Sequence, residues 1–278
     1  MKRILLPSLF TIAALSSNAQ DLPRPSPLGK VEQVVGLTNV QVVYSRPSAK
    51  GRVVFGDVVP YNALWRTGAN TCTKISFDGP VVIEGKAVPA GKYALLSMPG
   101  ESTWKLMLNS DTTLRGTDGY DAAKNIAEFT ANAVSGADQT ETFTIGFEAV
   151  KDDHAKLELR WEKTKVSLDI HADAMEKAMA NIKVALSAAD VKAGAYHSSA
   201  RFYVDRGMDP AQALAWAKQA DSMEQKYWMK HTLALCYAAD GKKADAIATA
   251  KQSMAMAETE KDAAYVKLNQ AKIDEWSK

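Results

Sequence analysis

The chain has 278 residues, of which 46% are hydrophobic and 24% charged, with 2 cysteines and 4 histidines. This composition is typical of one large or two ordinary globular domains, and it excludes an intrinsically disordered chain and a disulfide scaffold. The formal net charge is +2. Lys2 and Arg3 supply that excess ahead of the first acid, Asp21, so residues 20–278 carry no net charge. A neutral chain argues against general nucleic-acid binding.

The N-terminus has the three-part layout of a secretory signal peptide. Lys2 and Arg3 precede an apolar stretch over residues 4–15, and Ser17 and Ala19 place small residues at the two cleavage positions. The apolar stretch is too short to span a membrane, and no cysteine follows it for a lipid anchor. We therefore expect residues 1–19 to be removed on export to the periplasm or the medium. Residues 20–30 are predicted to be a flexible, proline-rich leader.

Residues 31–171 show the period-two alternation of half-buried strands. Turn residues such as Asp78, Gly79 and Pro80 separate the apolar runs, and no amphipathic helix is evident between them. The pattern predicts an antiparallel β-sandwich or jelly-roll-like domain. The expected strands are 40–44, 74–77, 81–83, 92–96, 104–108, 126–133, 143–147, 157–161 and 166–170.

Residues 172–278 are alanine-rich and helical in pattern, with two internally similar stretches. The Ala-x-x-Tyr pair at Ala200 recurs at Ala234, a shift of 34 residues, and the alanine pattern at Ala213 recurs at Ala246, a shift of 33 residues. The period resembles that of tetratricopeptide repeats, which stack helix pairs and dock proteins or peptides. An unrelated pair of helical hairpins is the alternative. Flanking helices over 173–185 and 262–276 are expected to cap the array.

A basic loop (residues 46–70) stands out within the predicted β domain. It contains four cations and a single acid, Asp57. The cations are Arg46, Lys50, Arg52 and Arg66. Arginine binds carboxylate or phosphate through two parallel hydrogen bonds, and functional loops are often carried on rigid sheets. The loop is therefore a candidate anion-binding site. Its candidate ligand-binding residues are Arg46, Lys50, Arg52, Tyr61, Arg66 and Asn70.

A structural role explains the same residues equally directly. Arg46 and Arg66 are each able to pair with an acid of the loop or sheet, and Trp65 is a suitable core residue. The acids in question are Asp57, Glu148, Glu158 and Glu162. Whether the arginines converge on an open pocket therefore decides between the two interpretations.

Several long motifs occur in order: YSRPSAKGRVVFG, PYNALWRTGAN, VPAGKYALLSMPG and LRWEKTKV. Over residues 27–171 the chain thereby resembles the domain of unknown function 2911 family. The resemblance implies an exported bacterial β-rich domain, often followed by helical repeats, and it implies no activity. The family usually has an acidic residue after the GAN triplet, where this chain has Thr71 and Cys72. That departure weakens a catalytic interpretation.

Other chemistry leaves little trace in the sequence. Motifs of α/β-hydrolases, phosphate-binding loops, dinucleotide folds and zincins are absent from the sequence. His154 and His171 have no metal-ligand partner at a recognisable spacing, so neither a cofactor nor a metal is predicted. The two cysteines are expected to be buried, inert thiols.

Two classes of function remain. The first is a cell-envelope binding or scaffolding protein, whose β domain holds an anionic small molecule, glycan or peptide carboxylate and whose helical tail docks a protein partner. The second is a hydrolase-type enzyme acting on an anionic glycan or phosphoester, for which Tyr44, Tyr61 and Asp57 are the nearby candidates for a nucleophile or base. A purely structural envelope protein is a further alternative. No nucleic-acid partner and no membrane span are expected.

Overall fold

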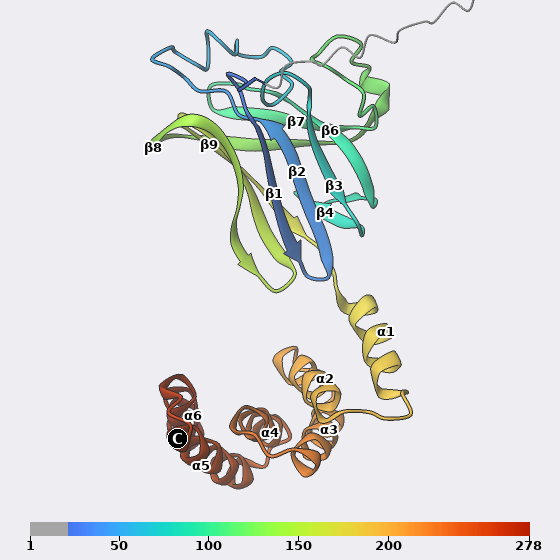
Figure 1. The fold of residues 1–278 in the computed structure, drawn as a ribbon, viewed down its shortest axis with the longest axis vertical. Helices are drawn as coiled ribbons and strands as arrows, with labels where there is room; N and C mark the ends of the chain where they lie inside the picture. The colour runs from blue at the N-terminus through green and yellow to red at the C-terminus, as the bar shows by residue number, and fades with distance from the viewer. Residues whose placement is uncertain (1–21) are drawn as a thin grey trace, which may run out of the picture. The chain divides into compact units, whose positions relative to one another are not determined.

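A computed structural model describes residues 22–278, so the predicted signal peptide lies outside the described residues. The chain divides into two compact units with the boundary between Asp173 and Ala174. We call them the β unit and the helical unit and describe each by itself (Figure 1). In residues 22–278 no helix is both long and apolar enough to cross a membrane.

The β unit is one antiparallel sheet with the strand order β1-β2-β3-β6-β7-β8-β9-β4-β5. The predicted antiparallel β architecture is therefore confirmed. Strand β1 begins at Leu28, inside the range expected for the leader. The strands are β1 (Leu28–Val35), β2 (Thr38–Ser45), β3 (Thr73–Phe77), β4 (Val81–Ile83), β5 (Lys86–Val88), β6 (Gly91–Met98), β7 (Thr103–Asn109), β8 (Asn125–Lys151) and β9 (His154–His171).

The long strands β8 and β9 fold the sheet over on itself. Residues 125–132 of β8 pair with β7, whereas residues 133–151 pair with β9. The backbone pairing of β8 with β9 is interrupted around Gly136, which has a φ of 83°, and around Glu162, which has a φ of 49°. Strand β9 doubles back there, as two ion pairs between its halves show. Lys165 lies 3.2 Å from Glu158, and Asp169 lies 3.3 Å from Lys156. Figure 1 shows the bend near the labels of β8 and β9.

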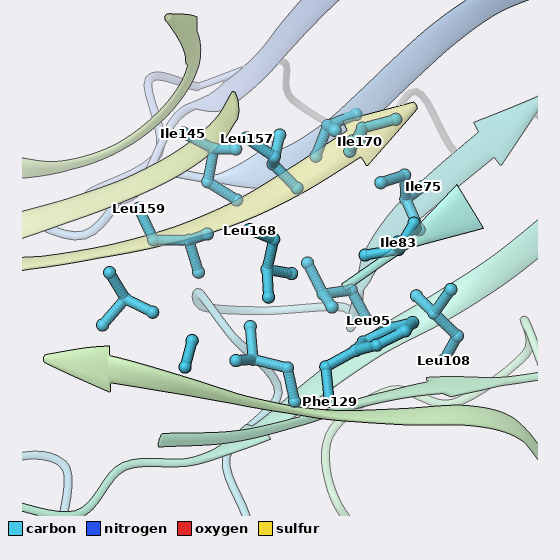
Figure 2. Packing of buried hydrophobic residues seen from close by; sticks show 14 of the residues in the cluster. Ile75, Ile83, Leu95, Leu108, Phe129, Ile145, Leu157, Leu159, Leu168 and Ile170 are labelled. Atoms are coloured by element: carbon cyan, nitrogen blue, oxygen red, sulfur yellow. The ribbon is translucent and has the colours of Figure 1, made fainter. Parts of the chain in front are cut away.

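The folded sheet encloses the main hydrophobic core. Leu157 and Leu168 of β9 face Leu95 of β6 and Phe129 in the first part of β8, and all four side chains are buried (Figure 2). Burying one large aliphatic side chain stabilises a fold by about 1.5–3 kcal/mol. The apolar residues of the alternation that predicted the strands are thus the side chains that point into this core.

The helical unit contains six helices, the first and last of which match the expected flanking helices. Asp209 caps α3 by accepting a hydrogen bond from the Gln212 amide at 3.0 Å, and Pro210 occupies the first turn. The helices are α1 (Met175–Leu186), α2 (Ala193–Asp205), α3 (Pro210–Met223), α4 (Tyr227–Ala239), α5 (Lys243–Thr259) and α6 (Ala263–Trp276).

The small residues of the two similar stretches are the ones that the helices bury. Ala200, Ala213, Ala234 and Ala246 are all fully buried, on α2, α3, α4 and α5 in turn. A side chain of this size allows two helices of a pair to approach closely. The predicted helical, repeat-like array is therefore confirmed.

Candidate functional site

The basic loop is fastened to the sheet along its length. Just beyond β2, the amide of Ala49 donates to the carbonyl of Glu141 at 2.8 Å, which ties the loop to β8. Farther along, Trp65 exchanges two backbone hydrogen bonds with Ser97 of β6, at 2.7 and 2.9 Å. The loop is consequently a well-bonded part of the fold.

Aromatic side chains anchor the loop to the core. Trp65 is 9% exposed and its indole nitrogen donates to the carbonyl of Gly68 at 3.0 Å. Its ring centroid lies 5.2–6.2 Å from four other aromatic rings. These rings belong to Phe55, Trp104, Phe143 and Trp161. The interpretation of Trp65 as a core residue is therefore correct.

A hollow of about 390 Å³ lies over this aromatic cluster. Trp65 and Trp161 contribute its aromatic wall, while Arg52 and Arg66 bring positive charge to it. No acidic residue is among the residues that line it. Those residues are Ser26, Pro47, Arg52, Val58, Val59, Trp65, Arg66, Gly68, Ala69, Asn70 and Trp161. We call this the arginine hollow.

The two arginines of the hollow are held by backbone carbonyls. Arg52 donates from Nε to Ala49 at 2.9 Å and from Nη2 to Ser48 at 2.9 Å. Arg66 donates from Nη1 to the carbonyl of Asn70 at 2.8 Å. A guanidinium has five N–H donors. Donors therefore remain on both groups after these bonds are made, and neither arginine forms an ion pair with an acid of residues 22–278.

Asn70 lines the hollow, but its amide nitrogen fastens the loop. Nδ2 donates to the carbonyl of Ser26 and to Oγ of Ser45, both at 3.1 Å. The residue has a φ of 58°, a backbone conformation that asparagine tolerates better than most residues. Asn70 thus joins the segment before β1 to the end of β2, and it positions the carbonyl that holds Arg66.

The other three candidate residues lie outside the hollow. Arg46 donates from Nε to the carbonyl of Phe143 at 3.2 Å and from Nη2 to Oγ1 of Thr144 at 2.8 Å, which fixes it to β8. Lys50 is exposed. Tyr61 packs against Gly56, where an added Cβ would lie 2.9 Å from the ring. The structure therefore brings Arg52, Arg66 and Asn70 to one hollow and leaves Arg46, Lys50 and Tyr61 away from it.

None of the acids named as internal partners forms an ion pair with Arg46 or Arg66 within residues 22–278, and three of them have other partners. Glu158 bonds to Arg160 and Lys165, and Glu162 accepts the amide of Val54 at 3.1 Å. Burial by itself raises the pKa of the Glu158 carboxyl, and the hydrogen bonds from Arg160 and Lys165 outweigh it and lower the pKa. Glu148 also pairs with Arg160, at 3.2 Å. Of the two interpretations left open, carboxylate pairing of Arg46 and Arg66 is not what the structure has: carbonyl and hydroxyl oxygens accept their hydrogen bonds.

Sequence reasoning did not single out Trp161 or Ser26 as lining residues. Trp161 lies in the LRWEKTKV motif, about a hundred residues beyond the loop, and it reaches the hollow only because β9 folds back. The sole sequence feature pointing to it was that motif. Ser26 comes from the segment that was expected to be a leader.

The groups named from the sequence as nucleophile or base are missing from the wall of the arginine hollow, where Ser26 is the one hydroxyl among the lining residues and no carboxylate or imidazole lines it to act as a base. Tyr44 is buried, and its hydroxyl is bonded to the amide and the carbonyl of Ile145 at 2.8 and 3.1 Å. Asp57 and Tyr61 are not lining residues. Burial raises the pKa of the Cys72 thiol to about 12, so it is protonated and inert at neutral pH. The lining fits recognition of an anion better than hydrolysis.

Comparison with known proteins assigns the β unit to a family. A family model described as "Protein of unknown function (DUF2911)" matches residues 26–170, which is just over half of the chain. The chain belongs to this family. No curated protein and no solved structure matches the chain. The family match covers the whole basic loop and the motif that carries Trp161, so both walls of the arginine hollow belong to the family region.

Proposed function

We propose that the β unit is a binding module for a small anionic ligand, such as an acidic sugar or a peptide carboxylate, that occupies the arginine hollow. One observation carries this proposal. Arg52 and Arg66, which form no ion pair with an acid of the described chain, line a hollow whose wall includes Trp65 and Trp161.

The chemistry of the wall favours a ligand with both a charged and an apolar part. A guanidinium binds carboxylate or phosphate through two parallel hydrogen bonds, and Val58, which is 39% exposed, offers apolar surface beside the largely buried rings of Trp65 and Trp161. The volume of about 390 Å³ is within the range of small-molecule sites. A planar carboxylate attached to a sugar ring or a peptide end combines these features.

The hydrolase alternative receives less support from the same geometry. Hydrolysis of a glycan commonly needs a pair of carboxyl groups, and acyl or phosphoryl transfer needs a positioned base or nucleophile. The acids and tyrosines named for that role, Asp57, Tyr44 and Tyr61, are not lining residues of the hollow. Binding without turnover is the function that its lining supports best.

The substitution Arg66→Met provides the test, because methionine keeps an unbranched stem and removes the guanidinium. Losing a charge-assisted hydrogen bond costs about 1.5–3 kcal/mol, so we expect Arg66→Met and Arg52→Met each to weaken ligand binding roughly tenfold or more. Calorimetric titration with sulfate, phosphate, glucuronate and a short peptide with a free carboxylate measures the affinity. Lys50→Met is the matched control, since it removes a cation of the same loop that does not line the hollow.

Three outcomes would count against this proposal. If none of these anions binds the wild type, the hollow has no anion-binding role. If Lys50→Met weakens binding as much as Arg66→Met, the effect is one of general charge. Turnover of a glycan or phosphoester that is lost with Asp57→Asn would instead support the hydrolase.

The second part of the proposal concerns the compartment and the helical unit. We infer an exported cell-envelope protein whose helical unit docks a protein or peptide partner. The supporting observation is a hollow of about 450 Å³ within that unit, to which α2, α4 and α6 all contribute. Its wall combines apolar side chains with two cations and one acid, Asp205, which pairs with Arg201 at 2.7 Å. The lining residues are Arg201, Val204, Asp205, His231, Leu235, Ala238, Leu268, Lys272 and Trp276.

One preparation tests both statements. The protein isolated from the periplasm or medium is expected to begin at Gln20 by intact-mass measurement. A photo-crosslinking residue at Leu235 is expected to capture one defined partner from the same fraction, whereas the same residue at the exposed Val184 is not. A full-length cytoplasmic chain would overturn export, and equal capture from both positions would overturn docking in this hollow.

A further inference from the structure

The two ends of β9 meet because the strand doubles back. His154 begins β9 and His171 ends it, yet their imidazole rings stack with centroids 4.3 Å apart and planes inclined by 27°. They are 17 positions apart along the chain, so their spacing in the sequence resembles no metal-binding motif. Only the fold brings the pair together.

A carboxylate lies against both rings. Asp153, in the turn between β8 and β9, places Oδ1 2.8 Å from Nδ1 of His154 and Oδ2 3.5 Å from Nε2 of His171. One ligand atom from each of the three side chains lies within 4.8 Å of the other two. Two imidazole nitrogens and a carboxylate oxygen thus lie close together at the surface.

We propose that Asp153, His154 and His171 form a binding site for a divalent transition-metal ion, with Zn²⁺ as the ion to test. Zinc binds imidazole nitrogen at about 2.0–2.1 Å and carboxylate oxygen at about 2.0–2.2 Å in tetrahedral geometry, which puts neighbouring ligand atoms about 3.4 Å apart. The observed separations of 2.8 and 3.5 Å lie on either side of that value. The two rings are stacked, so at least one imidazole must rotate about its side-chain bonds to turn its nitrogen toward the ion and complete the site.

Backbone hydrogen bonds hold the three residues in place without the ion. The carbonyl of Asp153 accepts from the amide of Ala172 at 2.8 Å, which ties the β8–β9 turn to the end of β9. The carbonyl of the neighbouring Asp152 accepts from the amide of Gly36 in the β1–β2 turn at 3.0 Å. His171 is also paired with Val82 of β4. Because the backbone is fixed by four strands, the ion has little chain to order.

An ion can reach this cluster from solvent. The side chain of His154 is 64% exposed and that of His171 is 36% exposed, whereas Asp153 is 14% exposed. Three protein ligands leave the fourth position of a tetrahedral ion to water or to a ligand from outside the chain. On binding, the metal takes the place of the proton on the coordinating nitrogen; a neutral imidazole then carries its proton on the other ring nitrogen, and an imidazolium releases one proton to solvent.

The remaining histidines and both thiols are occupied elsewhere. His197 contacts the hydroxyl of Thr232 at 3.0 Å, and His231 contacts the amide oxygen of Asn269 at 2.8 Å. Burial lowers the pKa of both imidazoles. Burial also raises the pKa of Cys236 to about 12, as it does for Cys72, so neither thiol offers a thiolate at neutral pH. Zinc binding is therefore expected at a single place.

Titration of the full chain with Zn²⁺ tests the proposal, using protein freed of metal and of any histidine tag. We expect one ion per chain and a weakening of at least tenfold for His154→Ala and for His171→Ala, because loss even of an outer-shell partner commonly costs 10–100-fold in metal affinity. Asp153→Asn should weaken binding as well. Asp152→Asn is the matched control, since it removes the neighbouring carboxylate of the same turn, which is outside the cluster.

Imidazole nitrogen NMR locates the ion independently of affinity. Zn²⁺ is expected to shift the ring signals of His154 and His171 and to leave those of His197 and His231 unchanged. Absence of zinc binding, equal binding by the His154→Ala/His171→Ala double variant, or shifts confined to the other two histidines would each overturn the proposal. The cluster shares no residue with the arginine hollow, so the two sites succeed or fail separately.

Discussion

Replacing Trp65 by alanine is expected to lower the free energy of unfolding of the β unit by about 3–5 kcal/mol, the usual cost of deleting a large buried aromatic side chain. The position is central to the aromatic cluster, with ring contacts to Phe55, Trp104, Phe143 and Trp161. The substitution leaves a cavity between the loop and the sheet, and it removes the indole hydrogen bond to Gly68.

Scanning calorimetry of the full chain measures this effect, with the transition of the β unit followed separately from that of the helical unit. For a unit of this size, each kcal/mol corresponds to about 2–4 °C in Tm, so a drop of roughly 10 °C is expected. Val53→Ala is the control, because Val53 belongs to the same loop and is 64% exposed. Equal and small effects of both substitutions would show that the loop does not hold the core together.

The strands that the sequence predicted are those with one face in the core. From Thr38 to Tyr44 of β2, buried side chains alternate with half-buried ones, which is the alternation that the pattern detects. Strand β1 was missed because it is an edge strand with few fully buried side chains. Such a strand is held mainly by its backbone pairing with β2, which leaves little trace in hydrophobicity.

The fold-back of the β8–β9 hairpin was beyond the reach of the sequence. Its bends lie at Gly136 and Glu162, and a glutamate with a φ of 49° has no sequence signature. The sequence predicted 126–133 and 143–147 as separate strands, but both belong to the long, bent β8. Likewise 157–161 and 166–170 both belong to β9. That bend delivers Trp161 to the arginine hollow and His154 to His171, so the composition of both sites depends on it.

The sequence located the basic loop but did not distinguish its arginines by role. Arg46, Arg52 and Arg66 are of one residue type in one loop, and which of them faces a hollow depends on where the loop crosses β8 and β6. Arg46 comes directly after β2 and extends along the sheet toward β8. Arg66 follows Trp65, whose burial turns the neighbouring side chain outward to the hollow.

Arg46→Met is accordingly expected to affect stability and leave ligand binding intact. The guanidinium bonds the carbonyl of Phe143 and the hydroxyl of Thr144, and losing hydrogen bonds from a charged group costs about 1.5–3 kcal/mol. The stem of the side chain lies against Gly29, where an added Cβ would be 2.8 Å from Cδ of Arg46. Methionine keeps that packing and isolates the contribution of the guanidinium.

The comparison of Arg46→Met with Arg66→Met separates a structural arginine from a binding one in the same assay. Denaturant unfolding should show the loss for Arg46→Met and little change for Arg66→Met, because the carbonyl of Asn70 that Arg66 holds belongs to an exposed residue. Anion titration should show the opposite order. If Arg46→Met abolishes anion binding without loss of stability, Arg46 belongs to the ligand site and the boundaries of the arginine hollow are drawn too narrowly.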